Sequence, residues 1–316
     1  MPQRIILREV GLRDGLQIHP TFMPSADKLA WIAAEAATGM PEIEVTSYVP
    51  AKLIAQFADS DAVTAGALAV PGLTVSALIP NLRGAQRGIE LGVHKLNFVM
   101  SVSRTHNLKN VRRTPEESIA DFRAIVALVR SQPDGHRPVI SGGLSTALGC
   151  SYEGRIAVSQ VLACAVQLLE AGAQELQVAD TVGYADPVQV RELFRALLAE
   201  SGSVPVAAHF HDTRGTGLAN VSAALDCGVT MFDASLAGLG GCPFAPCASG
   251  NIVMEDLCFM LDSMGLETGV DIGQLLQVRE RVSLALPDIA MQGALARAGL
   301  PRNYQTATQR SAISIK

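Results

Sequence analysis

The sequence repeats one pattern eight times: a short run of β-branched and apolar residues is followed by a stretch with helical periodicity. Parallel strands need long crossover connections, which helices usually supply. The repeats therefore predict parallel strands with helices outside them, in a closed (β/α)₈ TIM barrel or an open doubly wound sheet. The predicted strands are Ile5–Val10, Glu42–Ser47, Leu73–Ile79, Lys95–Ser101, Val139–Leu144, Glu175–Asp180, Val204–His211 and Met231–Ser235.

A barrel is favoured over the open sheet, because the strands are evenly spaced and no Gly-x-Gly-x-x-Gly follows the first one. No linker rich in Pro, Ser or Gly divides the 316 residues, so we expect one TIM-barrel catalytic domain over residues 1–316. The barrel should span about 4–265. Residues 266–316 should form a C-terminal extension that contains a helix over Ile272–Leu286 and ends in a polar tail.

Several residues are typical of helix ends. Ser25 is expected to cap a helix that closes at Gly39. Thr114 and Glu117 have the spacing of a capping box around a first-turn proline. Asp186, also followed by proline, predicts another helix start.

Composition excludes several kinds of partner. The formal charge is −5, without a run of five like charges, and aromatic residues make up 4% of the chain, so a nucleic-acid or anionic-membrane surface is disfavoured. The longest apolar stretch, residues 156–173, is interrupted by polar residues and does not predict a membrane span. The start of the chain shows no signal core, and the six cysteines form no Cys-x-x-Cys pair. We therefore expect reduced thiols and a cytoplasmic protein.

Charged and metal-binding residues cluster at the ends of predicted strands. Arg13 and Asp14 follow the first strand, and Glu44 and Asp180 lie near the ends of the second and sixth. His209 and His211 close the seventh strand on the same face. Each pair alone could be a turn, a cap or a polar rim, but the strands of a barrel end at one mouth, where active sites lie. Together they predict a site.

A glycine-rich loop, Gly238–Asn251, follows the eighth strand. Alone, such a loop could also bind phosphate. Cys242 within it could act as a proton donor, with Cys247 as the competing candidate. Cys164, Cys227 and Cys258 are expected to be buried small residues within helices. The other histidines are expected to be solvated loop residues: His19, His94, His106 and His136.

One carboxylate, two imidazoles and an amide oxygen would form a mixed O/N ligand set. Such a set fits Mg²⁺ or Mn²⁺, with Zn²⁺ or Co²⁺ as alternatives. A divalent ion can polarise a carbonyl and a neighbouring hydroxyl, an arginine can stabilise an enolate, and a thiol can move a proton at carbon. These groups suit the cleavage or formation of a carbon–carbon bond next to a carbonyl.

At these motifs the chain resembles the 3-hydroxy-3-methylglutaryl-CoA lyases, which are metal-dependent TIM-barrel lyases. The resemblance runs from about residue 4 to 270 and rests on the segments Glu9–Gln17, Glu44–Ser47, Ala147–Gly154, Ala179–Gly183, His209–Thr213 and Gly238–Asn251. It implies cleavage of the acyl-CoA into acetyl-CoA and acetoacetate by a homodimer.

The resemblance also implies roles for the site residues. The divalent ion would be bound by Asp14, His209, His211 and Asn251. Arg13, supported by Glu44, would stabilise the enolate, and Cys242 would protonate it. Asp180 would lie near the tertiary hydroxyl, Asp14 or His209 would help to remove its proton, and Glu255 would support the site from the next helix.

The chain departs from the family pattern at Ile18, His19, Gln177, Arg104 and His106, all on the side of the acyl group. A lyase for citramalyl-CoA or for a longer 3-substituted glutaryl-CoA is therefore an alternative. A Claisen-type synthase or aldolase of the same barrel group would share Arg13, Asp14 and the two histidines but would not need Cys242. A non-catalytic metal-binding barrel is the third hypothesis.

Overall fold

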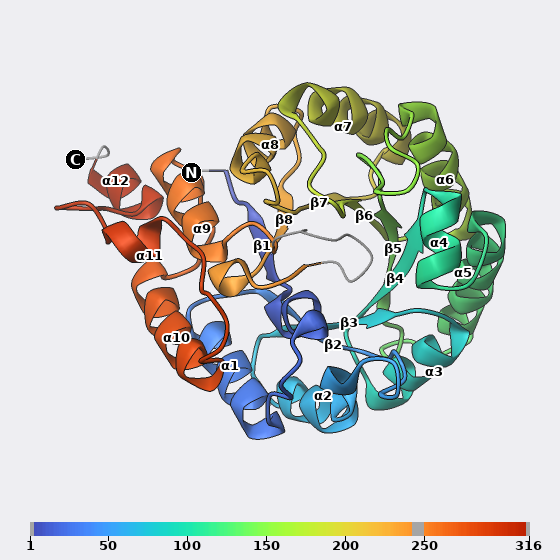
Figure 1. Ribbon diagram of the computed structural model, residues 1–316, viewed down its shortest axis with the longest axis horizontal. Coiled ribbons are helices and arrows are strands. Elements are labelled where there is room, and N and C mark those ends of the chain that lie inside the picture. Colours follow the sequence, from blue (N-terminus) through green and yellow to red (C-terminus); the bar gives the residue numbers. More distant parts are fainter. Residues whose placement is uncertain (1–2, 242–249, 314–316) are drawn as a thin grey trace.

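The chain forms a closed barrel of eight parallel strands, which the computed structural model describes over residues 3–241 and 250–313 (Figure 1). The strands follow one another around the barrel in sequence order, and β1 closes it by pairing with β8. The prediction of a TIM barrel is therefore confirmed, and the open sheet is excluded. The strands are β1 (Ile6–Glu9), β2 (Glu42–Ser47), β3 (Thr74–Ile79), β4 (Lys95–Ser101), β5 (Val139–Ser145), β6 (Glu175–Asp180), β7 (Val206–Phe210) and β8 (Met231–Ala234).

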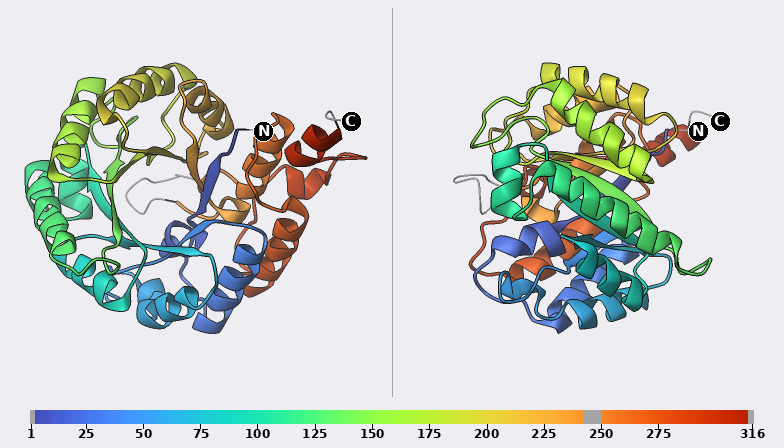
Figure 2. Two further views of the ribbon diagram at one scale, coloured as in Figure 1. Left: turned by 180° about the vertical axis from the view of Figure 1, so that it is seen from behind. Right: turned by 90° about the vertical axis from the view of Figure 1, so that its right-hand side faces the viewer.

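Helices surround the barrel as a ring, as both views along its axis show (Figures 1 and 2). They are α1 (Ser25–Ala37), α2 (Ser60–Leu68), α3 (Leu82–Leu91), α4 (Arg104–Asn110), α5 (Pro115–Arg130), α6 (Val158–Ala171), α7 (Pro187–Ser201), α8 (Gly217–Leu225), α9 (Met254–Ser263), α10 (Ile272–Ala285), α11 (Leu295–Ala298) and α12 (Ala307–Ile313). Within the described ranges, no helix combines the length and apolar character needed to cross a membrane.

The predicted helix caps are confirmed in two of three cases. Thr114 and Glu117 form the capping box of α5, and the Asp186 side chain caps α7. Ser25 is not a cap: it is the first residue of α1, and its hydroxyl donates to Asp59 at 2.7 Å instead of accepting from the helix backbone. Asp59 belongs to the next βα unit and binds the hydroxyl in place of the helix backbone. The sequence around Ser25 does not indicate this contact.

Apolar side chains fill the space between strands and helices. Charged side chains fill the interior of the barrel at the end where the strands begin. Lys95 Nζ lies 2.9 Å from Glu42 Oε2 and 2.7 Å from Glu175 Oε2. Arg8 also pairs with Glu175, and its Nε lies 2.5 Å from Asp233 Oδ1. All five side chains are buried. TIM barrels usually place branched apolar residues here. This barrel instead carries a buried network of charges below its site.

Candidate active site

Arg13 and Asp14 lie on a single π-helical turn, Gly11–Gly15, directly after β1. The backbone amides of Arg13, Asp14 and Gly15 all donate to the Val10 carbonyl, which winds the turn wider than an α-helix, a geometry frequent at functional sites. Glycine is required at position 11, because a Cβ there would lie 2.5 Å from Glu9 Oε1 and 2.9 Å from the Trp31 ring.

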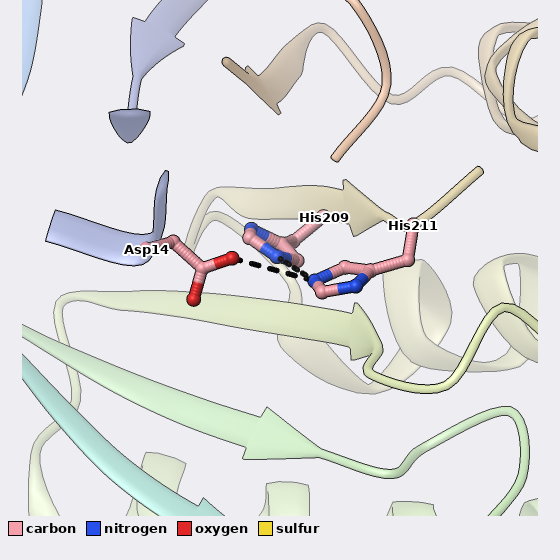
Figure 3. Close-up of side chains that lie close together, drawn as sticks. All are labelled: Asp14, His209 and His211. Atoms are coloured by element: carbon pink, nitrogen blue, oxygen red, sulfur yellow. Dashed lines mark hydrogen bonds and ion pairs between the residues drawn. The ribbon is translucent and has the colours of Figure 1, made fainter. Parts of the chain in front are cut away.

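Three of the four predicted metal ligands, Asp14, His209 and His211, lie together in Figure 3. One ligand atom each from Asp14, His209 and His211 falls within 4.8 Å of the others. The two Nε2 atoms are 3.1 Å apart, and Asp14 Oδ2 lies 3.5 Å from His211 Nε2. Asn251 reaches the cluster because its backbone pairs with that of His211, and its Nδ2 donates to Asp14 Oδ2 at 2.8 Å.

The donor set fits a divalent cation. Asn251 Nδ2 uses both of its protons, on Asp14 Oδ2 and on the Leu239 carbonyl, so the amide orientation is fixed. Its Oδ1 is buried and has no hydrogen-bond partner in the described structure. A buried acceptor without a partner is costly, and an ion beside two imidazoles and a carboxylate would satisfy it.

Electrostatics favour the same conclusion. Burial would raise the pKa of Asp14, but Arg13 and the two imidazoles outweigh it and hold that pKa below its usual range. Arg13 Nη1 lies 2.5 Å from Asp14 Oδ1, and Gln17 Nε2 donates to the same oxygen at 2.7 Å. The Asp14 carboxylate is therefore ionised and held in one orientation, as a metal ligand would need to be.

Glu44 lies against Arg13, the pairing that the family resemblance implies. Its Oε2 lies 3.5 Å from Arg13 Nε, and its Oε1 accepts from Asn97 Nδ2 at 2.8 Å. Burial raises the pKa of Glu44 against the opposing effect of Arg13. Asn97, on β4, was missed by sequence reasoning, although its position two residues after Lys95 places both on one face of the strand.

Asp233 was also missed. It lies on β8 beside His209 in the barrel register, fully buried, and its Oδ2 is 3.1 Å from His209 Nδ1. Burial alone would lower the pKa of His209, but Asp233 raises it. A single aspartate inside a short strand carries no motif, so only its inward face could have indicated this role.

A cavity of about 130 Å³ opens beside the cluster. Its walls combine Arg13, Glu44 and the two histidines with apolar residues such as Leu78 and Phe98. His106 also lines it, so its prediction as a solvated loop residue is wrong. The ring is buried because α4 packs over the end of β4, its Nδ1 lies 2.7 Å from Ser101 Oγ, and burial lowers its pKa to about 4.

Asp180 is placed differently from the other predicted residues. Its carboxylate accepts the backbone amides of Tyr184 and Ala185 at 2.9 and 3.1 Å, and it is absent from the cavity lining. Its contacts are those of a turn residue, and its catalytic role stays a prediction. Glu255 supports the segment after β8, accepting from the Ala237 amide at 2.9 Å and from Arg279.

The candidate thiols Cys242 and Cys247 lie outside the described residues. Cys164 and Cys258 are buried, as predicted, and burial raises the pKa of both thiols. Cys227 is only partly buried and follows α8 instead of lying within a helix.

Comparison with known proteins agrees with this geometry. The family model described as HMGL-like matches residues 4–282. The chain belongs to the HMGL-like family. The hydroxymethylglutaryl-CoA lyase of Bacillus subtilis is 39% identical over 295 residues, which cover 92% of this chain and 97% of that protein. The cytoplasmic 3-hydroxy-3-methylglutaryl-CoA lyase of Danio rerio is 38% identical, covering 90% and 84%.

Solved structures extend the HMGL-like match to three dimensions. An HMG-CoA lyase from Acinetobacter baumannii, in complex with coenzyme A and 3-methylmalate, superposes with a TM-score of 0.89 at 38% identity, covering 96% of this chain and 97% of that one. The predicted family and the predicted class of carbon–carbon lyase are confirmed by these relatives.

Proposed function

We propose that this HMGL-like protein cleaves 3-hydroxy-3-methylglutaryl-CoA into acetyl-CoA and acetoacetate with the help of a divalent ion. The observation that carries the proposal is the buried Asn251 Oδ1, which has no hydrogen-bond partner among residues 3–241 and 250–313 and lies beside Asp14, His209 and His211 at the cavity. The lyases named above, which match over nearly the whole chain, support the choice of acyl-CoA.

The reaction begins with loss of the proton from the tertiary hydroxyl. Asp14 and His209 are the two groups that the family resemblance implies for taking this proton. Asp233 accepts from Nδ1–H of His209, so Nε2 of that ring can either bind the ion or take the proton, and not both at once. As the C–O bond becomes a carbonyl, the C2–C3 bond breaks and its electrons pass to the thioester as an enolate. A divalent ion, when bound by the four ligands, would polarise the hydroxyl and carbonyl oxygens.

Arg13 is the group that stabilises the enolate oxygen. Its guanidinium is held between Asp14 and Glu44 and still lines the cavity, so it is oriented before the charge develops. Protonation of the enolate carbon would then give acetyl-CoA. We assign this proton to Cys242, with support from its place in the glycine-rich motif; Cys247 remains the competitor.

Turnover of a panel of 3-hydroxyacyl-CoA thioesters with Mg²⁺ and with Mn²⁺, followed by mass spectrometry, tests the proposal. We expect 3-hydroxy-3-methylglutaryl-CoA to give the highest kcat/KM, and Cys242→Ser to lose turnover but keep metal binding. A higher kcat/KM for citramalyl-CoA or for a longer acyl group would show that this thioester, and not 3-hydroxy-3-methylglutaryl-CoA, is the substrate. Full activity of chelated, metal-free protein would refute the mechanism.

We further propose Mg²⁺ or Mn²⁺ as the ion, because oxygen atoms supply half of the four ligands. A homodimer and a cytoplasmic location complete the proposal. The location is supported by the absence of Cys-x-x-Cys pairs, although similar proteins include both cytoplasmic and mitochondrial lyases. Metal analysis of the purified protein and light scattering after gel filtration test the ion and the assembly.

A further inference from the structure

Gln177 is the residue that connects the cavity with the support of the metal site. It lies on β6, lines the cavity, and donates through Nε2 to Asp233 Oδ2. The same Asp233 oxygen lies 3.1 Å from His209 Nδ1. A change in the position of the Gln177 side chain would therefore reach His209 through Asp233 Oδ2, the oxygen that both residues contact.

Asp233 has little freedom apart from this bond. Its other oxygen, Oδ1, lies 2.5 Å from Arg8 Nε, and the side chain is fully buried. An ionised carboxylate only accepts, so the His209 nitrogen that faces it, Nδ1, carries a proton, and the neutral ring then has its lone pair on Nε2. That tautomer is the one a metal ligand at Nε2 requires. Gln177 supplies the donor that holds Oδ2 in place from the cavity side.

Gln177 also limits the size of the cavity. Its neighbour in the sheet is Gly143 of β5, which has no side chain and also lines the cavity. A Cβ on Gly143 would lie 2.6 Å from the Phe98 carbonyl oxygen but 3.6 Å from Gln177 Oε1. The amide of Gln177 thus lies at ordinary van der Waals distance from the space beside Gly143, and both residues line the cavity. In this direction, the length of Gln177 sets the room for an acyl group.

We propose that Gln177 is both a specificity-determining and a positioning residue: its length restricts the C3 substituent of the acyl group to a small one, and its amide holds Asp233 on His209. The inference rests on the proposed function for the identity of the acyl group. The bond to Asp233 does not depend on it.

Two substitutions separate the two roles. Gln177→Met keeps the length but loses the donor, whereas Gln177→Ser shortens the side chain. We compare kcat/KM for 3-hydroxy-3-methylglutaryl-CoA and for its 3-ethyl analogue. Gln177→Ser should raise the ethyl-to-methyl ratio about tenfold or more, the discrimination that one methylene gives. Gln177→Met should leave the ratio within about twofold, while kcat falls about tenfold.

Measurements without substrate test the positioning role. In metal-free protein labelled with ¹⁵N-histidine, wild-type His209 should show the Nδ1–H tautomer, and both variants should show a mixture. The Kd for Mn²⁺, measured by electron paramagnetic resonance, should rise about tenfold in both. Gln274→Met is the matched control, because exposed Gln274 also donates to an aspartate, Asp271 at 2.9 Å, but on α10. It should match wild type throughout.

The outcomes keep the two proposals apart. If wild type cleaves 3-hydroxy-3-methylglutaryl-CoA but Gln177→Ser keeps the wild-type ratio, or Gln177→Met shifts it equally, the specificity role is wrong. If both variants keep the wild-type tautomer and Mn²⁺ affinity, the positioning role is wrong. If wild type cleaves no such thioester, the proposed function fails, and the tautomer and Mn²⁺ data still decide whether Gln177 positions His209.

Discussion

Replacing Arg8 by methionine tests whether the charged barrel interior stabilises the fold. The Arg8 side chain is 3% exposed and pairs with Glu175 and Asp233. After the substitution, Glu175 would keep Lys95 at 2.7 Å, and Asp233 would keep His209 and Gln177. Both buried carboxylates would nevertheless lose the positive charge of Arg8. Removal of one partner from a buried ion pair costs about 3–5 kcal/mol.

The expected shift in melting temperature follows from chain length. At about 2.1 cal/mol/K per residue, 316 residues give an unfolding entropy of about 0.66 kcal/mol/K. The loss therefore corresponds to a decrease of about 5–8 K in Tm. Calorimetry on metal-free protein near neutral pH measures this without a contribution from metal binding.

The control is Arg87→Met, which makes the same chemical change at an exposed arginine paired with Asp61 and Glu90. Exposed ion pairs contribute little, so its Tm should stay within about 2 K of wild type. If Arg8→Met behaved like Arg87→Met, the buried network would not stabilise the fold, and the reasoning would be refuted.

Three further predictions concern the site and its surroundings. Asn251→Ala should raise the Kd for Mn²⁺ about tenfold or more by removing an oxygen ligand, and unchanged affinity in a resonance titration would exclude Asn251 from the ligand set. Arg13→Lys should lower kcat about a hundredfold while Mn²⁺ affinity changes little, because a lysine cannot reproduce the guanidinium geometry; equal losses in both would contradict a role in enolate stabilisation. Burial, with the nearby Glu255, raises the pKa of Glu35 to about 7, so the folded chain holds this proton more tightly than the unfolded one. The resulting stability is complete below about pH 4.5 and is lost as the pH rises through about 7. Glu35→Gln, which can still accept from Trp31 Nε1, should therefore lose less Tm than wild type between about pH 5 and pH 8, and parallel curves would count against this assignment.

The fold could be predicted because eight short runs rich in apolar and β-branched residues alternate with stretches of helical periodicity. Strand ends were less certain. The seventh strand was predicted over Val204–His211, but β7 covers Val206–Phe210, because the sheet register with β6 and β8 and the bridge from His211 to Asn251 determine where it stops. These partners are distant in sequence, so local patterns carry no information about them.

Two features place a residue in the site, its position along the strand and the face of the strand on which it lies, and the sequence reasoning applied the second one to the seventh strand alone. Position at a strand end gives the height along the barrel axis, and it correctly brought Asp14, His209 and His211 to one point. Alternation along the strand decides between the interior and the helix layer. On β6, Gln177 and Ala179 line the cavity, and the Asp180 carboxylate accepts from the backbone amides of Tyr184 and Ala185. Applied to β8, the same rule selects Asp233 directly beside His209, without any motif.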